Sequence, residues 1–98
     1  MENFKQYQHR RIITTDGLIA NGDFIMPDIV VRITDGFLND AMDDKGNIYP
    51  AIETLDGNHI EHWKNGVLHC VTAPAVVDNI DNYEEWWFEG HKIEPKGA

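Results

Sequence analysis

Residues 59–71 read HIEHWKNGVLHCV, two short segments rich in apolar residues on either side of Asn65-Gly66. Asparagine and glycine both tolerate the positive φ that a two-residue hairpin turn requires. Short segments of this composition around such a pair predict β-strands. The stretch therefore predicts a tight β-hairpin in the middle of the chain.

Similar turn signals divide the rest of the chain. They are Asp16-Gly17, Asn21-Gly22, Asp35-Gly36, Lys45-Gly46, Asp56-Gly57 and Glu89-Gly90. The segments between them are short and rich in Ile, Val, Thr, Tyr and Trp, which favours strands. In residues 29–34, alternation places Ile29, Val31 and Ile33 on one face. We expect an all-β fold, an antiparallel meander of stacked β-hairpin repeats, with at most one short helix.

That helix would lie in residues 37–44. Asp35 could serve as its N-cap, and Phe37, Leu38 and Met42 would form its apolar face. A segment of this length is not stable as an isolated helix, so whether it forms is left open.

The hairpin belongs to an imperfect tandem repeat. The interval from Pro50 to Gly66 is sixteen residues, and so is the interval from Pro74 to Gly90. The other aligned pairs are Asn58 with Asn82, Glu61 with Glu85 and Trp63 with Trp87. We interpret 1–98 as a single domain with N-terminal strands in 1–35, repeat 1 in 36–66, repeat 2 in 66–90 and a partial repeat and tail in 90–98. Six extra residues within 39–49 lengthen the first copy.

These motifs resemble a family of tandem repeats related to MORN-repeat variants, in which a Trp-Trp or Trp-Tyr pair precedes Asn-Gly, then Leu-His, then Pro-Ala. The matching segments are residues 63–69, 74–76 and 86–90. Such repeats occur in many small proteins of bacteria and their phages, and the resemblance implies a stacked β-hairpin sheet without catalysis. The chain departs from the pattern at His62, at Cys70 in place of the usual basic residue, and in residues 1–35.

One hairpin of this kind cannot bury enough apolar surface, so neighbouring hairpins must stack. Trp86 and Trp87 are adjacent and must point to opposite faces of the sheet. We expect one of them in the core. The other either meets the N-terminal strands or lies exposed as an interface anchor.

Charge and composition exclude several classes of function. Seventeen acids against eight Lys and Arg give a net charge of −9, which opposes direct binding to nucleic-acid phosphates. No apolar run is long enough to span a membrane, and residues 1–11 lack the apolar region of a signal peptide. The single cysteine, Cys70, fits a reducing cytoplasm.

Nothing in the sequence indicates catalysis, a metal or a cofactor. The chain has no serine, and Cys70 lies in an expected apolar strand. His59 and His62 are three apart and should face opposite sides of a strand, so they should not bind one zinc ion. The acidic segment 40–47 does not fit a calcium loop, since Met42, Lys45 and Ala51 occupy positions that require other residues.

The acidity instead favours a basic protein partner, unless it only confers solubility. We expect a small inhibitor, of phage origin and of the anti-CRISPR or anti-restriction type, that acts in the host cytoplasm by mimicking nucleic acid. The alternative is a non-catalytic β-repeat adaptor or oligomerisation module, as monomer or homodimer. The expected partner-binding residues are Asp23, Asp28, Asp35, Asp40, Asp43, Asp44, Glu53, Asp56, Asp78, Asp81, Glu84, Glu85, Trp86 and Glu89.

Overall fold

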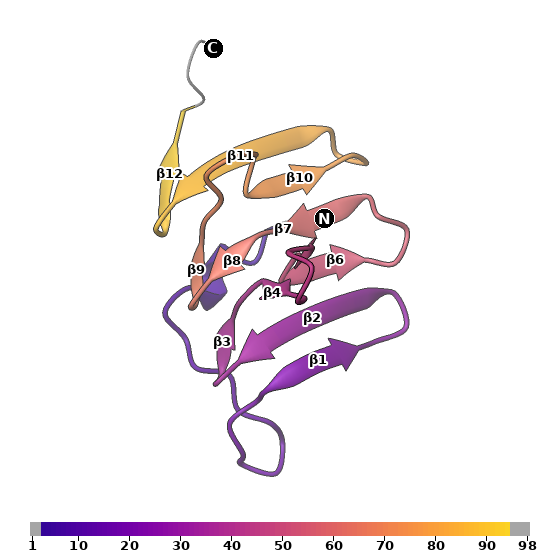
Figure 1. The fold of residues 1–98 in the computed structure, drawn as a ribbon, viewed down its shortest axis with the longest axis vertical. Helices are drawn as coiled ribbons and strands as arrows, with labels where there is room; N and C mark the ends of the chain where they lie inside the picture. Colours follow the sequence, from indigo (N-terminus) through magenta and orange to yellow (C-terminus); the bar gives the residue numbers. More distant parts are fainter. Residues whose placement is uncertain (1–2, 95–98) are drawn as a thin grey trace.

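A computed structural model describes residues 3–94 and confirms the all-β fold (Figure 1). The strands are β1 (Gly22–Ile25), β2 (Ile29–Thr34), β3 (Phe37–Leu38), β4 (Ala41–Met42), β5 (Ile48–Tyr49), β6 (Ile52–Thr54), β7 (His59–Glu61), β8 (Trp63–Lys64), β9 (Val67–Leu68), β10 (Val76–Asp78), β11 (Tyr83–Phe88) and β12 (His91–Ile93). The main sheet runs in the order β1-β2-β6-β7-β10-β11-β12, and its strand pairs are antiparallel.

The short helix considered for residues 37–44 does not form. Phe37–Leu38 is β3 and pairs with Ile33 and Thr34 of β2, and Ala41–Met42 is β4. The turn at Asp35-Gly36 sends the chain back along β2, where strand pairing satisfies the backbone groups that a helix would have used. A single 3-10 turn, η1 (Lys5–Tyr7), lies instead in the N-terminal segment.

Three two-residue turns lie at the same end of the strands. Asp35, Asn65 and Glu89 have φ of 52°, 49° and 49°, and the glycine after each has φ between 86° and 88°. Positive φ at both positions is the geometry of the hairpin turns that suit twisted strands. The Asn-Gly hairpin expected at residues 59–71 is present, with β8 and β9 paired around Asn65-Gly66.

These glycines also join one hairpin to the next. The N–H of Gly36 donates to Ala20 O, that of Gly66 to Leu38 O and that of Gly90 to Leu68 O, at 2.7, 2.8 and 2.9 Å. A Cβ at Gly66 would lie 2.8 Å from the ring of Phe37. Glycine at the turn is therefore required by the backbone conformation and by the close stacking of consecutive hairpins.

The first hairpin unit begins earlier than the sequence comparison indicated. Residues 22–38 form β1, β2 and β3 around Asp35-Gly36, the same arrangement that β6–β9 and β10–β12 form later. Ile33 occupies the position held by Trp63 and Trp87 in the later units. The unit was hidden in the sequence because its core residue is aliphatic and its first strand lacks the Pro-Ala pair.

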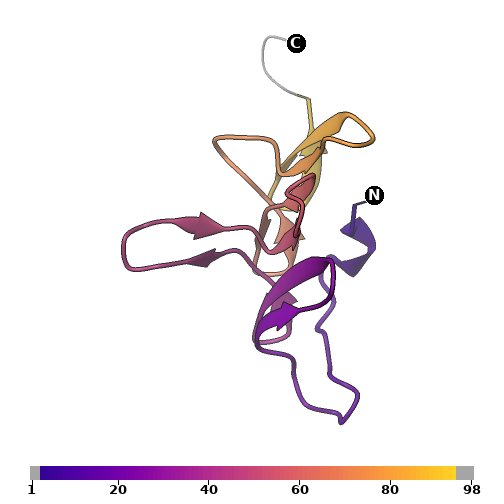
Figure 2. The same cartoon turned by 90° about the vertical axis from the view of Figure 1, so that its right-hand side faces the viewer.

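The extra residues of the first repeat form a separate hairpin, β4–β5. Figure 2 shows it projecting from one side of the sheet, with the N-terminal segment on the other side. Asp43 stabilises its tip by accepting hydrogen bonds from the N–H groups of Lys45 and Asn47, both at 2.9 Å.

The core lies between the sheet and the N-terminal segment. Trp63, Leu68 and Val76 are at most 1% exposed, and Phe4 packs against this cluster. Trp87 belongs to the core, whereas Trp86 is only half-buried. The expectation that one of the two adjacent tryptophans enters the core is therefore confirmed.

Candidate functional site

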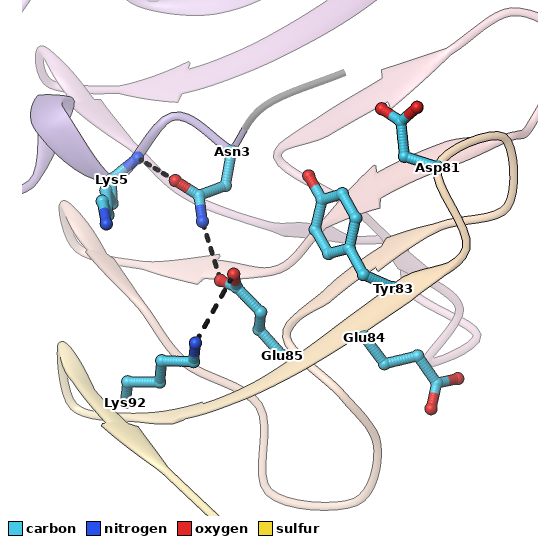
Figure 3. A pocket seen from close by; sticks show the side chains of 7 residues that line it. All are labelled: Asn3, Lys5, Asp81, Tyr83, Glu84, Glu85 and Lys92. Atoms are coloured by element: carbon cyan, nitrogen blue, oxygen red, sulfur yellow. Dashed lines mark hydrogen bonds and ion pairs between the residues drawn. The ribbon is translucent and has the colours of Figure 1, made fainter.

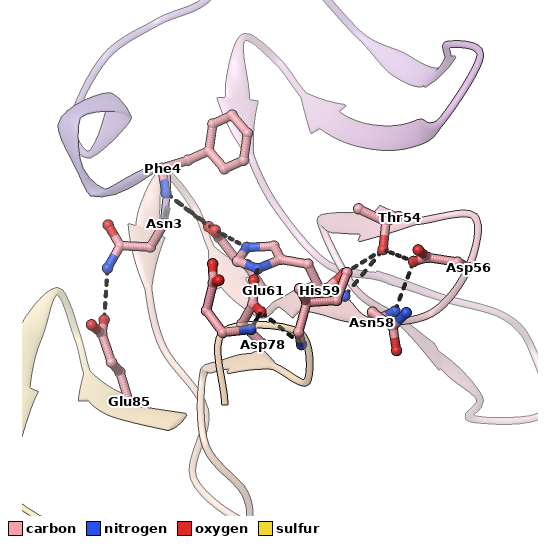
Figure 4. Close-up of polar contacts among 11 residues, drawn as sticks. Asn3, Phe4, Thr54, Asp56, Asn58, His59, Glu61, Asp78 and Glu85 are labelled. Atoms are coloured by element: carbon pink, nitrogen blue, oxygen red, sulfur yellow. Dashed lines mark hydrogen bonds and ion pairs between the residues drawn. The ribbon is translucent and has the colours of Figure 1, made fainter. Parts of the chain in front are cut away.

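A buried charged cluster joins the second hairpin unit to the third. Antiparallel pairing of β7 with β10 places His59 opposite Asp78, and alternation along β7 puts Glu61 on the same face as His59. His59 Nδ1 lies 2.7 Å from Asp78 Oδ2, and its Nε2 lies 2.7 Å from Glu61 Oε2 (Figure 4). All three side chains are at most 2% exposed.

Every carboxylate of this cluster has several donors. Glu61 accepts hydrogen bonds from Trp63 Nε1 at 3.0 Å and from the N–H of Phe4 at 3.1 Å. Asp78 accepts the N–H groups of Ile80 and Asp81, at 3.0 and 2.7 Å. Such bonds compensate for the loss of hydration that buried charges suffer.

The two carboxylates set the protonation state of the histidine. Burial by itself disfavours the imidazolium, but hydrogen bonds and charge from Glu61 and Asp78 outweigh burial and raise the pKa of His59. The N–H of Asp81, together with His59, holds the pKa of Asp78 well below its usual range. Since both imidazole nitrogens are engaged, the cluster offers no open position for a substrate.

Asp78 corrects one expectation from the sequence. It was expected in an exposed acidic patch, but it is 2% exposed and cannot contact a partner. The reason is its register, because Asp78 lies on the inward face of β10 together with the fully buried Val76.

Asp40 is also tied into the structure. It accepts hydrogen bonds from the N–H groups of Ala51 and Trp63, at 2.7 and 2.9 Å, and lies 2.7 Å from His62 Nδ1. It therefore anchors the base of the β4–β5 hairpin.

Several other expected partner-binding acids have a basic neighbour. Arg32 contacts Glu53 and lies 3.7 Å from Asp23, and Arg11 lies 3.3 Å from Asp35. Lys64 lies 3.0 Å from Glu89, which lowers the pKa of Glu89, and Lys92 lies 3.8 Å from Glu85. These pairs reduce the negative charge on the surface of the sheet and at the strand ends that carry the three glycine turns.

The opposite end of the strands gathers three acids on neighbouring hairpin loops. The loops that close β1–β2, β6–β7 and β10–β11 lie at the same end of the strands (Figure 1). They carry Asp28, Asp56 and Asp81. We call these three residues the acidic tip row. All three are exposed, and the loops 26–28, 55–58 and 79–82 contain no Lys or Arg.

Backbone hydrogen bonds hold the tips together. The N–H of Leu55 donates to Asp28 O at 3.0 Å, and that of Asn79 donates to Asn58 O at 2.7 Å. Since consecutive hairpins are two strands apart, the tips repeat about every 10 Å. Hydrogen bonds from the N–H of Asn58 and the hydroxyl of Thr54 lower the pKa of Asp56, so it is ionised at neutral pH.

An acidic hollow of about 470 Å³ adjoins the last tip (Figure 3). Its lining residues are Asn3, Lys5, Asp81, Tyr83, Glu84, Glu85 and Lys92. Asn3 Nδ2 donates to Glu85 at 2.7 Å, and Trp87 Nε1 donates to the same oxygen at 2.9 Å. Burial, together with the charge of Asp78, raises the pKa of Tyr83 to about 12. Tyr83 therefore stays a neutral phenol.

Sequence reasoning missed Tyr83 and Asn3 as members of this hollow. The alternation Tyr83-Glu85-Trp87 carried a signal for Tyr83, since it follows the same face as His59-Glu61-Trp63. No sequence signal places Asn3, which is eighty-two residues from Glu85 along the chain.

A second hollow, of about 350 Å³, is almost wholly apolar. It lies between the N-terminal segment and the first hairpin unit, and its lining includes Tyr7, Ile13, Phe24, Met26 and Val31. Ile25, which lies between Phe24 and Met26 in the chain, is 75% exposed. Apolar surface of this kind can bind a ligand or another protein.

Residues 3–94 include no helix long and apolar enough to cross a membrane. Over the same residues, no three His, Cys, Asp or Glu side chains are grouped so that they could hold a metal ion. Comparison with protein-family models, with curated proteins and with solved structures found no significant match.

Proposed function

We propose that this chain is a non-catalytic protein-binding module that presents the acidic tip row to a basic surface of its partner. The observation that carries the proposal is the arrangement of Asp28, Asp56 and Asp81 on three stacked hairpin tips whose loops contain no base. A rigid sheet holds these carboxylates in a fixed row, which lowers the entropic cost of binding.

The charge of the whole chain supports the same partner class. A net charge of −9 attracts basic surfaces over long range, and proteins that bind nucleic acids expose such surfaces. In this proposal the tip row occupies positions where phosphates would otherwise bind. A bacterial defence protein, such as a CRISPR effector or a restriction enzyme in the host cytoplasm, is the target class that fits a phage-encoded inhibitor of this kind.

The structure narrows the residues on which the proposal rests. Of the acids expected to bind a partner, those of the tip row and the neighbouring Glu84 are exposed, and the loops 26–28, 55–58 and 79–82 contain no Lys or Arg. Asp40 and Asp78 have structural roles instead, as their hydrogen bonds indicate.

A second candidate function is an apolar adaptor. The apolar hollow next to β1 supports it, because Met26 lines that hollow and the neighbouring Ile25 is exposed. In that case Met26→Lys would abolish partner binding, and removing charge from the tip row would leave partner binding unchanged.

The test is affinity capture from the lysate of a bacterial host, with three forms of the chain and at two salt concentrations. The first form is wild type, and the second carries Asp28→Asn, Asp56→Asn and Asp81→Asn. The control carries Asp16→Asn and Glu94→Gln, which removes two formal charges from exposed positions outside the expected partner-binding residues.

We expect wild type and the control to retain a nucleic-acid-binding protein at low salt and the tip-row variant to lose it, because only the tip row is altered in that variant. High salt should weaken the capture, since exposed charges are screened. Equal losses in the control and the tip-row variant would mean that overall charge, and not this row, determines binding.

A further inference from the structure

The first strand of the main sheet has an open edge. β1 begins the sheet order and, within residues 3–94, pairs with β2 alone. The strands β2, β6, β7 and β10 each have a neighbour on both sides. In Figure 1, β1 lies at the lower end of the stacked hairpins, with its free side directed away from the other strands. A free strand edge is a template for another strand.

Two residues of β1 direct their backbone groups to the open side. The N–H of Met26 donates to Ile29 O at 2.9 Å, and bonding alternates along an antiparallel strand, so Phe24 also bonds to β2. The N–H and C=O groups of Asp23 and Ile25 therefore point outward. The edge offers two donors and two acceptors, placed symmetrically about Phe24.

The surface next to this edge is apolar. Phe24 and Met26 line the apolar hollow, and so does Ile13, which forms a bridge with Ile19 at the base of a loop. Figure 1 shows that this loop, residues 13–19, extends beyond β1, and Figure 2 shows it on the same side of the sheet as the N-terminal segment. Leu18 in this loop is 65% exposed. Exposed apolar surface beside a free strand edge favours an interface with another protein chain.

The end of the molecule that carries this edge has no net charge. Residues 3–36 contain four acids and four Lys or Arg, although the whole chain has a net charge of −9. Asp23, the acid of β1, lies 3.7 Å from Arg32 of the same chain. Two copies can therefore approach each other through β1 with little repulsion. A neutral, apolar end favours a second copy over a basic partner.

Symmetry and residue type select one register for two copies. A two-fold axis pairs the two β1 strands antiparallel, and the outward backbone groups allow this axis at Asp23, Phe24 or Ile25. An axis at Asp23 would place two Asp23 carboxylates directly opposite each other, which is destabilising. An axis at Ile25 would place Pro27, which has no N–H, opposite Asp23. An axis at Phe24 pairs Asp23 of one copy with Ile25 of the other and forms four backbone hydrogen bonds.

We propose that two copies of this chain associate through β1, antiparallel and with the two-fold axis at Phe24, so that the sheet continues from one copy into the other. Such an axis is perpendicular to the sheet and keeps both N-terminal segments on the same side. Loop 13–19 of each copy, which extends beyond β1, then covers apolar surface of the other copy. The inference goes beyond the proposed function and does not depend on it, since the tip row takes no part in the pairing.

The oligomeric state, measured by sedimentation velocity over a range of concentrations, tests the proposal. Ile25→Pro removes two of the four bonds between copies and no bond within the chain. Met42→Pro is its matched control, because Met42 is also an exposed strand residue. The bond from Asp43 N–H to Asn47 O places the N–H of Met42 on the side of β4 away from β5. Circular dichroism shows whether both variants fold.

We expect wild type and Met42→Pro to form the same dimer. The dimer of Ile25→Pro should dissociate at concentrations about tenfold higher or more, since two backbone hydrogen bonds are lost. Hydrogen exchange of the Ile25 amide should become slower as wild type is concentrated, because pairing protects this amide. Ile25→Thr keeps the N–H and should show the same slowing.

Cysteine variants test the register without a proline. Asp23→Cys and Ile25→Cys are made separately in a Cys70→Ala background, since Cys70 is the only cysteine of the chain. In the proposed register, position 23 of one copy and position 25 of the other have Cα atoms about 5.5 Å apart, which a disulfide can bridge. Identical positions are diagonal neighbours about 7–8 Å apart. Under mild oxidation, a mixture of the two variants should form a covalent dimer faster than either variant alone.

The proposal is overturned if wild type is monomeric at every concentration at which it stays dissolved, because the edge is then left to another protein. It is also overturned if Ile25→Pro dimerises like wild type, if Met42→Pro weakens the dimer equally, or if Asp23→Cys alone cross-links as fast as the mixture. Should Ile25→Pro fail to fold, cross-linking of the mixture decides. The tip-row variant keeps β1, so its failure in lysate capture and the loss of the dimer in Ile25→Pro are separate results.

Discussion

His59 and Asp78 are nineteen residues apart in the chain, yet His59 Nδ1 lies 2.7 Å from Asp78 Oδ2 inside the protein. This contact crosses the junction between β7 and β10, where the second hairpin unit meets the third. Glu61 on the other side completes a buried arrangement of one imidazole between two carboxyl groups. Polar contacts of His59, as well as apolar packing, therefore hold the second and third hairpin units together.

Replacing His59 should destabilise the protein strongly. His59→Leu would leave the buried Glu61 and Asp78 without the imidazole that bonds to both, and removing one partner of a buried pair costs about 3–5 kcal/mol. The free energy of unfolding in urea measures the effect. His91→Leu on exposed β12 is the control and should change stability by less than about 0.5 kcal/mol. Equal effects of the two substitutions would show that the cluster contributes nothing particular.

The same histidine predicts a pH dependence of stability. The pKa of His59 is raised by folding above its ordinary value of 6.5, so the folded state binds the proton more tightly than the unfolded chain. This contribution is complete below pH 6.5 and is lost as pH rises through the folded-state pKa. The melting temperature of wild type should therefore fall on the alkaline side of pH 6.5, and the slope should be smaller in His59→Leu. A wild-type melting temperature that rises with pH over this range would contradict the charge assignment.

Asp78 predicts a pH dependence of stability of the opposite sign at acidic pH. The pKa of Asp78 is depressed in the folded state, so its contribution is present above the ordinary value of 3.8 and disappears as pH falls below that value. Acid unfolding followed by tryptophan fluorescence should therefore shift to higher pH in Asp78→Asn. Unchanged acid unfolding would argue against a stabilising role of the ionised carboxylate.

Two glycine substitutions separate backbone strain from close packing. Gly46 and Gly66 have φ of 85° and 88°, but only a Cβ at Gly66 meets a neighbour, the ring of Phe37 at 2.8 Å. Gly46→Ala should cost about 1–2 kcal/mol from the left-handed backbone alone. Gly66→Ala should cost more, because the stacked hairpins must also move apart. Thermal unfolding of both variants measures the difference, and equal losses would mean that the close approach is tolerated.

The adjacent tryptophans should differ in role. Trp87 is 7% exposed and donates to Glu85, so Trp87→Ala should cost about 3–5 kcal/mol of stability. Trp86 is half-buried on the opposite face, so Trp86→Ala should reduce stability less. Unfolding in urea tests this, and partner capture with Trp86→Ala tests whether Trp86 also anchors an interface. A larger loss of stability for Trp86→Ala would reverse the assignment.

Local sequence signals predicted the strands and turns well for a clear reason. Asn65-Gly66 and Asp35-Gly36 determine their own backbone conformation through residues that tolerate positive φ, and Ile29–Thr34 alternates as a half-buried strand does. A helix was considered for residues 37–44 because residues that cap helices also form turns, and the local sequence did not distinguish the two. The structure has strands there instead.

The site was predicted less well, since burial of an acid depends on neighbours that are remote in the chain. Asp78 and Asp81 look alike in the sequence, but pairing with β7 buries the first and leaves the second on a hairpin tip. Asp40 was expected to bind a partner, and its bonds to Ala51 and Trp63 hold the inserted hairpin instead.

By itself, the sequence determined where the chain turns, which segments form strands, and that Glu61-x-Trp63 and Glu85-x-Trp87 are equivalent, because turn conformation and alternation depend on adjacent residues. Only the tertiary structure decided that residues 22–38 form a hairpin unit of the same kind, and that Asp28, Asp56 and Asp81 lie at one end of the strands. These features depend on how hairpins stack, and stacking joins residues that no local pattern connects.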